Sequence, residues 1–176
     1  ISGGKVKMGD NATIQVKGSS GGTGISIGQE TGSSVVETGK STSITVESDD
    51  MSIGILNDGG TMTASDNFSA HVSGAIDSYG VATADGGNTT IGSSARISVE
   101  SKEQVETGSI AVYTLGGNTV IGDNSTITAA VTAGAASGVN TTEGNTTLGH
   151  QVSITANGET AYGVNSTNGR TTLGNH

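Results

Sequence analysis

The chain has 176 residues, of which 30 are glycine, three are tyrosine and one is phenylalanine, and its formal net charge is -9. It contains no cysteine, which excludes disulfides, thiolate metal sites and cysteine nucleophiles. Seven basic against sixteen acidic residues disfavour nucleic acid and anionic membranes as partners, because both require a cationic surface. One domain is expected at this length, but so few aromatic rings argue against an ordinary globular core.

An internal repeat runs through the chain. Similar stretches begin at Gly86 (GGNTTIG), Gly116 (GGNTVIG) and Glu143 (EGNTTLG), and more divergent copies precede them. An equivalent position recurs every 25 to 30 residues between Gly9 and Gly174, with a serine in place of the glycine in one copy. A period in this range predicts a stacked repeat architecture.

Each repeat contains three short segments in which apolar and polar residues alternate, as in strands. The expected inward residues of the first two segments of the fourth repeat are Thr89, Ile91, Ile97 and Val99, and its third segment carries a small residue followed by a β-branched one, Ala111 and Val112. Three such segments, joined by turns rich in Gly, Asn, Asp and Ser, predict one coil of a solenoid. We therefore expect an all-β fold, a parallel β-solenoid with three short strands per coil and about six and a half coils over residues 1–176.

A column of threonines is expected inside this solenoid. Thr89, Thr119, Thr146 and Thr171 occupy the same inward position of successive repeats. An unpaired buried hydroxyl is costly, so we expect each one to bond to a neighbour in a ladder or to the backbone.

Two groups of residues are the candidate binding sites. The longest loop of the repeats spans Glu100 to Ser109 in the fourth repeat (ESKEQVETGS), and insertions in solenoids map to one face, often the binding face. The candidates in this inserted loop are Glu100, Lys102, Glu103 and Glu106. The candidates among the outward ladder positions are Thr128, Thr155 and Asn165.

Catalytic chemistry finds little support in the sequence. His71 and His150 have no partner at motif spacing, and no G-x-S-x-G elbow is present. Neither an EF-hand loop nor a calcium-binding nonapeptide repeat occurs. We therefore expect no enzyme activity, no catalytic or metal-binding residue and no cofactor.

The cadence of G-N-T-T-[IL]-G, S-I-T-[AV] and Y-G-V, strongest from Gly80 to Gly174, resembles the passenger-domain repeats of bacterial type V autotransporter adhesins. The resemblance implies a right-handed parallel β-helix on the surface of a Gram-negative cell. It also implies export through a C-terminal outer-membrane barrel outside this segment, and roles in adhesion, autoaggregation, biofilm formation and virulence. The leading hypothesis is therefore a non-enzymatic adhesin segment of a longer passenger domain. Its expected partner is the same protein on a neighbouring cell or a host or matrix ligand, without nucleic acid and without direct membrane insertion.

Three alternatives stay open. A carbohydrate-active β-helix, such as a polysaccharide lyase or a tailspike, would gather carboxylates on one face. Its candidate acids are Asp49, Asp50, Asp58, Asp66, Asp77 and Asp85. A passive structural spacer fits the repeat equally well. An ice-binding surface is suggested by the outward column Thr90, Val120, Thr147 and Thr172, although strands favour threonine on packing grounds.

Overall fold

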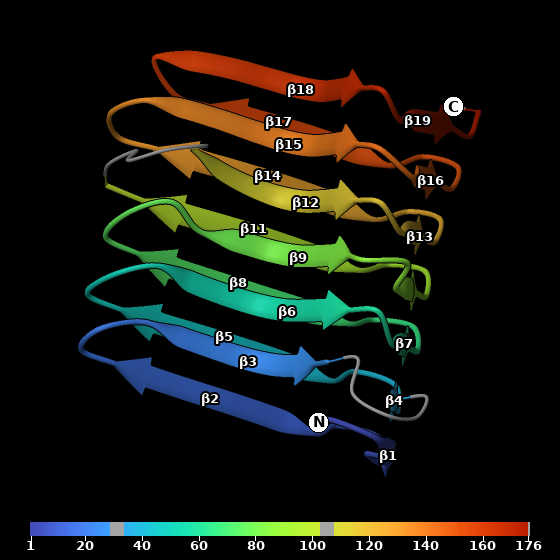
Figure 1. Cartoon of the computed structure of the whole chain (residues 1–176). Helices are drawn as coiled ribbons and strands as arrows, with labels where there is room; N and C mark the ends of the chain where they lie inside the picture. The colour runs from blue at the N-terminus through green and yellow to red at the C-terminus, as the bar shows by residue number, and fades with distance from the viewer. Residues whose placement is uncertain (29–33, 103–107, 176) are drawn as a thin grey trace.

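The computed structural model describes residues 1–28, 34–102 and 108–175. In this described part the chain forms nineteen strands and no helix, arranged in three parallel sheets (Figure 1). Sheet I contains β1 (Gly4–Lys7), β4 (Ser34–Thr38), β7 (Thr61–Ala64), β10 (Asn88–Ile91), β13 (Asn118–Ile121), β16 (Asn145–Leu148) and β19 (Arg170–Leu173). Sheet II contains β2 (Thr13–Gly18), β5 (Ser43–Ser48), β8 (Ser69–Gly74), β11 (Arg96–Ser101), β14 (Thr126–Val131) and β17 (Ser153–Asn157). Sheet III contains β3 (Gly22–Ile27), β6 (Ser52–Asp58), β9 (Tyr79–Ala84), β12 (Ser109–Leu115), β15 (Ala135–Thr142) and β18 (Thr160–Thr167).

The predicted β-solenoid is confirmed. The chain passes through sheets I, II and III in turn, which gives six three-strand coils followed by β19. Each strand pairs in parallel with the equivalent strand of the next coil, so that Thr89 lies beside Thr119, and Thr119 beside Thr146. In Figure 1 the strands of sheet II run behind those of sheet III while the chain rises from the N-terminus to the C-terminus, which makes the coil right-handed.

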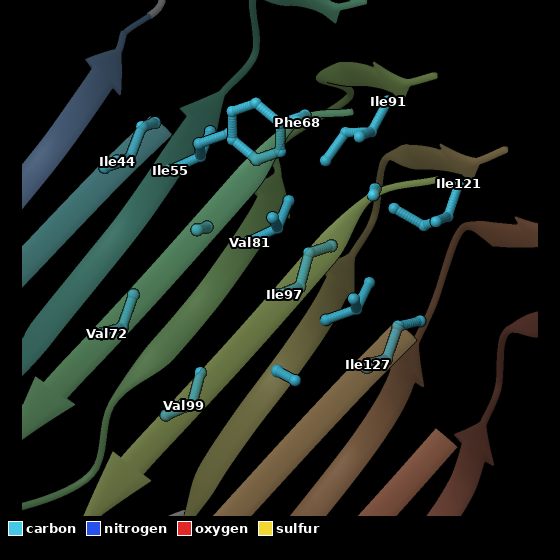
Figure 2. Close-up of a cluster of buried hydrophobic side chains, with 14 of the residues drawn as sticks. Ile44, Ile55, Phe68, Val72, Val81, Ile91, Ile97, Val99, Ile121 and Ile127 are labelled. Atoms are coloured by element: carbon cyan, nitrogen blue, oxygen red, sulfur yellow. The ribbon is translucent and has the colours of Figure 1, made fainter. Parts of the chain in front are cut away.

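The core is a stack of small aliphatic side chains (Figure 2). The predicted inward residues of the middle coils are buried; Ile44, Ile97 and Ile127 of sheet II, for example, are at most 1% exposed. The inward position is more open in the first and last coils, where Val6 is 39% and Leu173 is 58% exposed. The core is therefore sealed by neighbouring coils rather than by large side chains, which accounts for the aromatic-poor composition.

Sheets II and III approach each other closely, and this requires a small residue near the start of the third segment of each repeat. A Cβ atom on Gly80 would lie 2.6 Å from Cγ2 of Ile97 and 2.5 Å from the carbonyl oxygen of Ala111. Since real Cβ contacts are longer than this, a side chain at Gly80 would force the two sheets apart.

The corner between sheets I and II buries a residue that the sequence pattern missed. Asn67 has a φ of 59°, in the left-handed region that asparagine tolerates better than most residues. The tight turn directs the next side chain, Phe68, into the core, where it is fully buried. Thr42, Ala95 and Ser125 fill the same corner of neighbouring coils.

The threonine ladder exists, but its hydrogen bonds cross the interior instead of following the column. Thr119 accepts a hydrogen bond at 2.8 Å from Thr114 of sheet III, which itself accepts one at 2.8 Å from Thr146. Thr141 donates to Thr146 at 2.8 Å and pairs with Thr171 at 2.9 Å. One column of threonines from sheet I and one from sheet III therefore satisfy one another's hydrogen-bonding groups.

Candidate functional site

The predicted inserted loop from Glu100 to Ser109 was drawn too wide, because Glu100 and Ser101 belong to β11 and Ser109 begins β12. Glu100 and Lys102 line the same hollow of about 290 Å³ on the sheet II side, together with Ser73 and Thr132. Lys102 also borders the adjacent hollow of about 350 Å³, which Lys17, Glu47 and Asp49 line. Glu103 and Glu106, the other two loop candidates, lie outside the described residues.

The three outward ladder candidates lie on two different faces. Thr128 and Thr155 are register partners in β14 and β17 and share one column on the outer face of sheet II. Asn165 lies on β18 in sheet III, where its register partner is Asn140. The structure therefore brings Thr128 and Thr155 together but does not bring Asn165 to them.

The outer face of sheet I carries an extended surface without charge, of which the sequence analysis identified only the column Thr90, Val120 and Thr147. Its outward positions on β7, β10, β13 and β16 are all exposed. We call this surface the neutral face, and it consists of Thr61, Thr63, Asn88, Thr90, Asn118, Val120, Asn145 and Thr147. Strand pairing places them in two adjacent exposed columns. One column contains Thr61, Asn88, Asn118 and Asn145, and the other contains Thr63, Thr90, Val120 and Thr147.

Hydrogen bonds between side chains order the asparagines of the neutral face. The side-chain Nδ2 of Asn118 donates to Oδ1 of Asn88 at 3.0 Å, and Nδ2 of Asn145 donates to Oδ1 of Asn118 at 2.9 Å. The amide of Asn88 in turn donates to the backbone oxygen of Gly86 at 3.4 Å. Each amide of this ladder keeps hydrogen-bonding capacity for a partner, because a carboxamide has two donors and two acceptor lone pairs.

Charged side chains border the neutral face in the first two coils and in β19. Lys5 of β1 forms an ion pair of 2.6 Å with Glu37 of β4, and the hydrogen bond from Lys5 lowers the pKa of Glu37. Lys17 and Glu47 form the equivalent pair on sheet II, at 2.9 Å. Arg170 marks the other border, since it is the register partner of Asn145.

The aspartates lie at the corners of the solenoid. The carboxylates of Asp10, Asp66 and Asp123 at the corner between sheets I and II each accept a backbone N–H from the following coil, at 2.7 to 3.0 Å. Asp58 and Asp85 lie together at the corner between sheets III and I, where burial, followed by the charge and hydrogen bonding of Asp85, raises the pKa of Asp58. The corners are therefore negative, and the neutral face is not.

The six candidate carboxylates are spread over three corners of the solenoid instead of gathering on one face. Asp49, Asp50 and Asp77 lie at the corner between sheets II and III, whereas Asp58 and Asp85 lie at the next corner. Asp66 lies at the third corner, between β7 and β8. Asp50 and Asp77 line a common groove.

The two histidines of the described chain have structural partners. Nδ1 of His71 lies 2.9 Å from the hydroxyl of Ser98 in the same outward column of sheet II, as the predicted register requires. Nδ1 of His150 accepts the backbone N–H of Asn175 at 3.1 Å. Each contact joins a histidine to a residue of a neighbouring coil.

No family model, curated protein or solved structure matches the chain at a significant level. Across residues 1–28, 34–102 and 108–175, no three histidine or acidic side chains gather closely enough to hold a metal ion. The same residues contain no helix of the length and hydrophobicity needed to cross a bilayer.

Proposed function

We propose that this chain is a non-enzymatic adhesive segment on the outside of a Gram-negative cell, part of an autotransporter passenger domain, and that it joins cells through homotypic contacts. The observation that carries the proposal is the neutral face, an exposed and ordered array of asparagine and threonine side chains on four successive strands. The autotransporter origin and cell-surface location rest on the repeated sequence pattern, which resembles that of passenger domains of this class.

Electrostatics favours the neutral face as the contact surface between copies. Two chains with a net charge of -9 repel one another, most strongly where their acidic corners meet. Two neutral faces approach without this repulsion and exchange hydrogen bonds between amides and hydroxyls. Each contact is weak because it replaces hydrogen bonds to water.

Weak contacts suffice at a cell surface. Many copies on two cells engage together, and linked binding events raise the overall affinity by orders of magnitude, about 10²–10⁴ for two linked modules. A polar face also keeps the single chain soluble, because it offers no large apolar patch to other proteins.

The experiment is a settling assay on cells that display the parent protein. Asn118→Lys combined with Thr147→Lys places cations on the neutral face of every copy, so we expect clumping to fall to the level of non-displaying cells. The control, Thr126→Lys combined with Ser153→Lys, adds the same charge to exposed positions on sheet II and should leave clumping intact.

The alternatives make different predictions in the same assay. If the solenoid is a passive spacer, neither pair of substitutions changes clumping. If the inserted loop recognises a host or matrix ligand, replacing Glu100 and Lys102 reduces attachment to that surface and leaves homotypic clumping unchanged. Release of reducing ends or unsaturated products from polysaccharides by the wild-type protein would contradict the non-enzymatic assignment.

A further inference from the structure

We propose that a pair of carboxylates beside the neutral face weakens the contact between copies at neutral pH, and that mild acid or salt relieves this repulsion. The pair consists of Asp58, at the end of β6, and Asp85, in the turn between β9 and β10. We call it the acidic pair. The inference rests on the proposed homotypic contact, because it concerns how that contact is regulated.

The acidic pair lies beside the asparagine column of the neutral face. The backbone N–H of Gly59 donates to the oxygen of Ala84 at 3.1 Å, so the two turns are joined next to their carboxylates. Asn88 connects both turns to the neutral face, because its backbone N–H donates to the oxygen of Gly60 at 2.8 Å and its side chain to that of Gly86 at 3.4 Å. Two copies that meet through their neutral faces therefore carry their acidic pairs at the edge of the contact.

The surroundings of the acidic pair supply no positive charge within the described chain, whose two ion pairs join β1 to β4 and β2 to β5. Thr61 and Asn88, the first residues of β7 and β10, are neutral. Leu115 and Gly116 of the following coil accept backbone hydrogen bonds from the turn of Asp85 and do not ionise. Glu143, one coil further, adds negative charge. On the preceding coil the connection from β3 to β4 includes residues 29–33, which lie outside the described residues.

The two carboxylates of the acidic pair titrate together, and this makes the pair responsive to mild acid. Burial, followed by the charge and hydrogen bonding of Asp85, raises the pKa of Asp58 above its ordinary value of 3.8. As the pH falls through this raised pKa, the pair takes up a proton and loses one unit of negative charge. Two copies then repel one another less, so the contact strengthens. Salt acts in the same direction at pH 7, because it screens charges that are exposed to water.

The test is the settling assay on cells that display the parent protein, run from pH 7 down to pH 4. It is repeated at about 0.01 M and about 1 M salt, where the screening length falls from about 30 to about 3 Å. Wild-type cells should settle about two- to fivefold faster at the acidic end, the size expected for exposed charge pairs. Asp58→Asn combined with Asp85→Asn should settle at pH 7 as fast as the wild type does in acid, and should gain less from salt.

The matched control is Asp49→Asn combined with Glu100→Gln, which removes the same two charges from exposed positions away from the neutral face. This variant should keep the wild-type dependence on pH and salt. Equal behaviour of the two double variants would overturn the inference, because net charge alone would then set the pH dependence.

Two further outcomes separate this inference from the proposed function. Clumping that requires the neutral face but does not change with pH would overturn the inference and leave homotypic adhesion standing. Clumping that survives Asn118→Lys combined with Thr147→Lys would contradict the homotypic contact itself, and the inference with it.

Discussion

The hydroxyl of Thr146 donates a hydrogen bond of 2.8 Å to the hydroxyl of Thr114 across the interior of the solenoid, and it accepts a hydrogen bond from Thr141. The hydroxyl of Thr114 donates its own hydrogen bond to Thr119. A hydroxyl has a single donor hydrogen, and Thr141 already uses it in the hydrogen bond to Thr146. Thr171 is therefore the donor in the hydrogen bond between Thr141 and Thr171. Five hydroxyls therefore form one chain in which every bond has the same direction, an arrangement that strengthens each bond through polarisation.

Breaking this chain should destabilise the fold. Thr146→Val keeps the shape of the side chain but removes one donor and one acceptor from a fully buried site. We expect the free energy of unfolding to fall by about 1–3 kcal/mol, because Thr141 and Thr114 each lose a buried partner. Urea denaturation of the wild type and the variant measures the change.

Thr38→Val is the matched control, and it should change the free energy of unfolding in the opposite direction. Thr38 occupies the same sheet, is 4% exposed, and its hydroxyl has no hydrogen-bond partner in the described structure. Replacing an unsatisfied buried hydroxyl by a methyl group should raise the free energy of unfolding by about 1 kcal/mol. Equal effects of the two valine variants would show that the hydroxyl chain contributes nothing beyond side-chain packing.

Gly80 should not tolerate a single added methyl group. Gly80→Ala should lower the free energy of unfolding by about 1–3 kcal/mol, because the added Cβ meets Ile97 and the backbone of the next coil. Thermal unfolding followed by circular dichroism gives the change. The comparison is Gly163→Ala in the last coil, where a Cβ would have no heavy atom within 4 Å, and its cost should be clearly smaller.

The acidic pair at the corner between sheets III and I should make stability depend on pH. The pKa of Asp58 is raised above its ordinary value of 3.8 by burial and by Asp85. Between the ordinary and the raised pKa the folded chain binds more protons than the unfolded chain, so the free energy of unfolding falls as the pH rises through this window. Asp58→Asn should therefore be more stable than the wild type at pH 7, with the difference shrinking towards pH 3.

Denaturation at several pH values tests this expectation. Asp85→Asn removes the same repulsion from the other side, so the stabilisation by the two substitutions should not add in the double variant. A wild-type protein that is more stable than Asp58→Asn at pH 7 would mean that the carboxylates help rather than oppose folding.

Alternation along the sequence was enough to predict the coils, because a one-residue slip of a strand would turn its apolar side outward. The inward positions of Ile97 and Val99 and the threonine column of sheet I follow directly from that rule. The second threonine column was present in the sequence as well, since Thr83, Thr114 and Thr141 each come two residues after the inward valine of the third segment. It was missed because strand alternation does not show which inward columns face one another.

The corners were harder to predict than the strands. Phe68 looks like a turn residue in sequence, and only the left-handed backbone at Asn67 turns it into the core. Of the candidate binding residues, Thr128 and Thr155 were correctly placed outward in one column. One column of the neutral face, Thr90, Val120 and Thr147, was also predicted to point outward, but the asparagine column beside it was not noticed because outward columns were not compared with one another.

The central claim is homotypic adhesion, and a two-colour aggregation assay tests it most directly. Cells that display the protein carry one dye, non-displaying cells carry another, and the mixture is imaged after settling. The account predicts clumps of displaying cells alone, which disperse when the displayed protein carries Asn118→Lys with Thr147→Lys. Clumps that recruit both colours equally, or clumps that these substitutions leave unchanged, would contradict it.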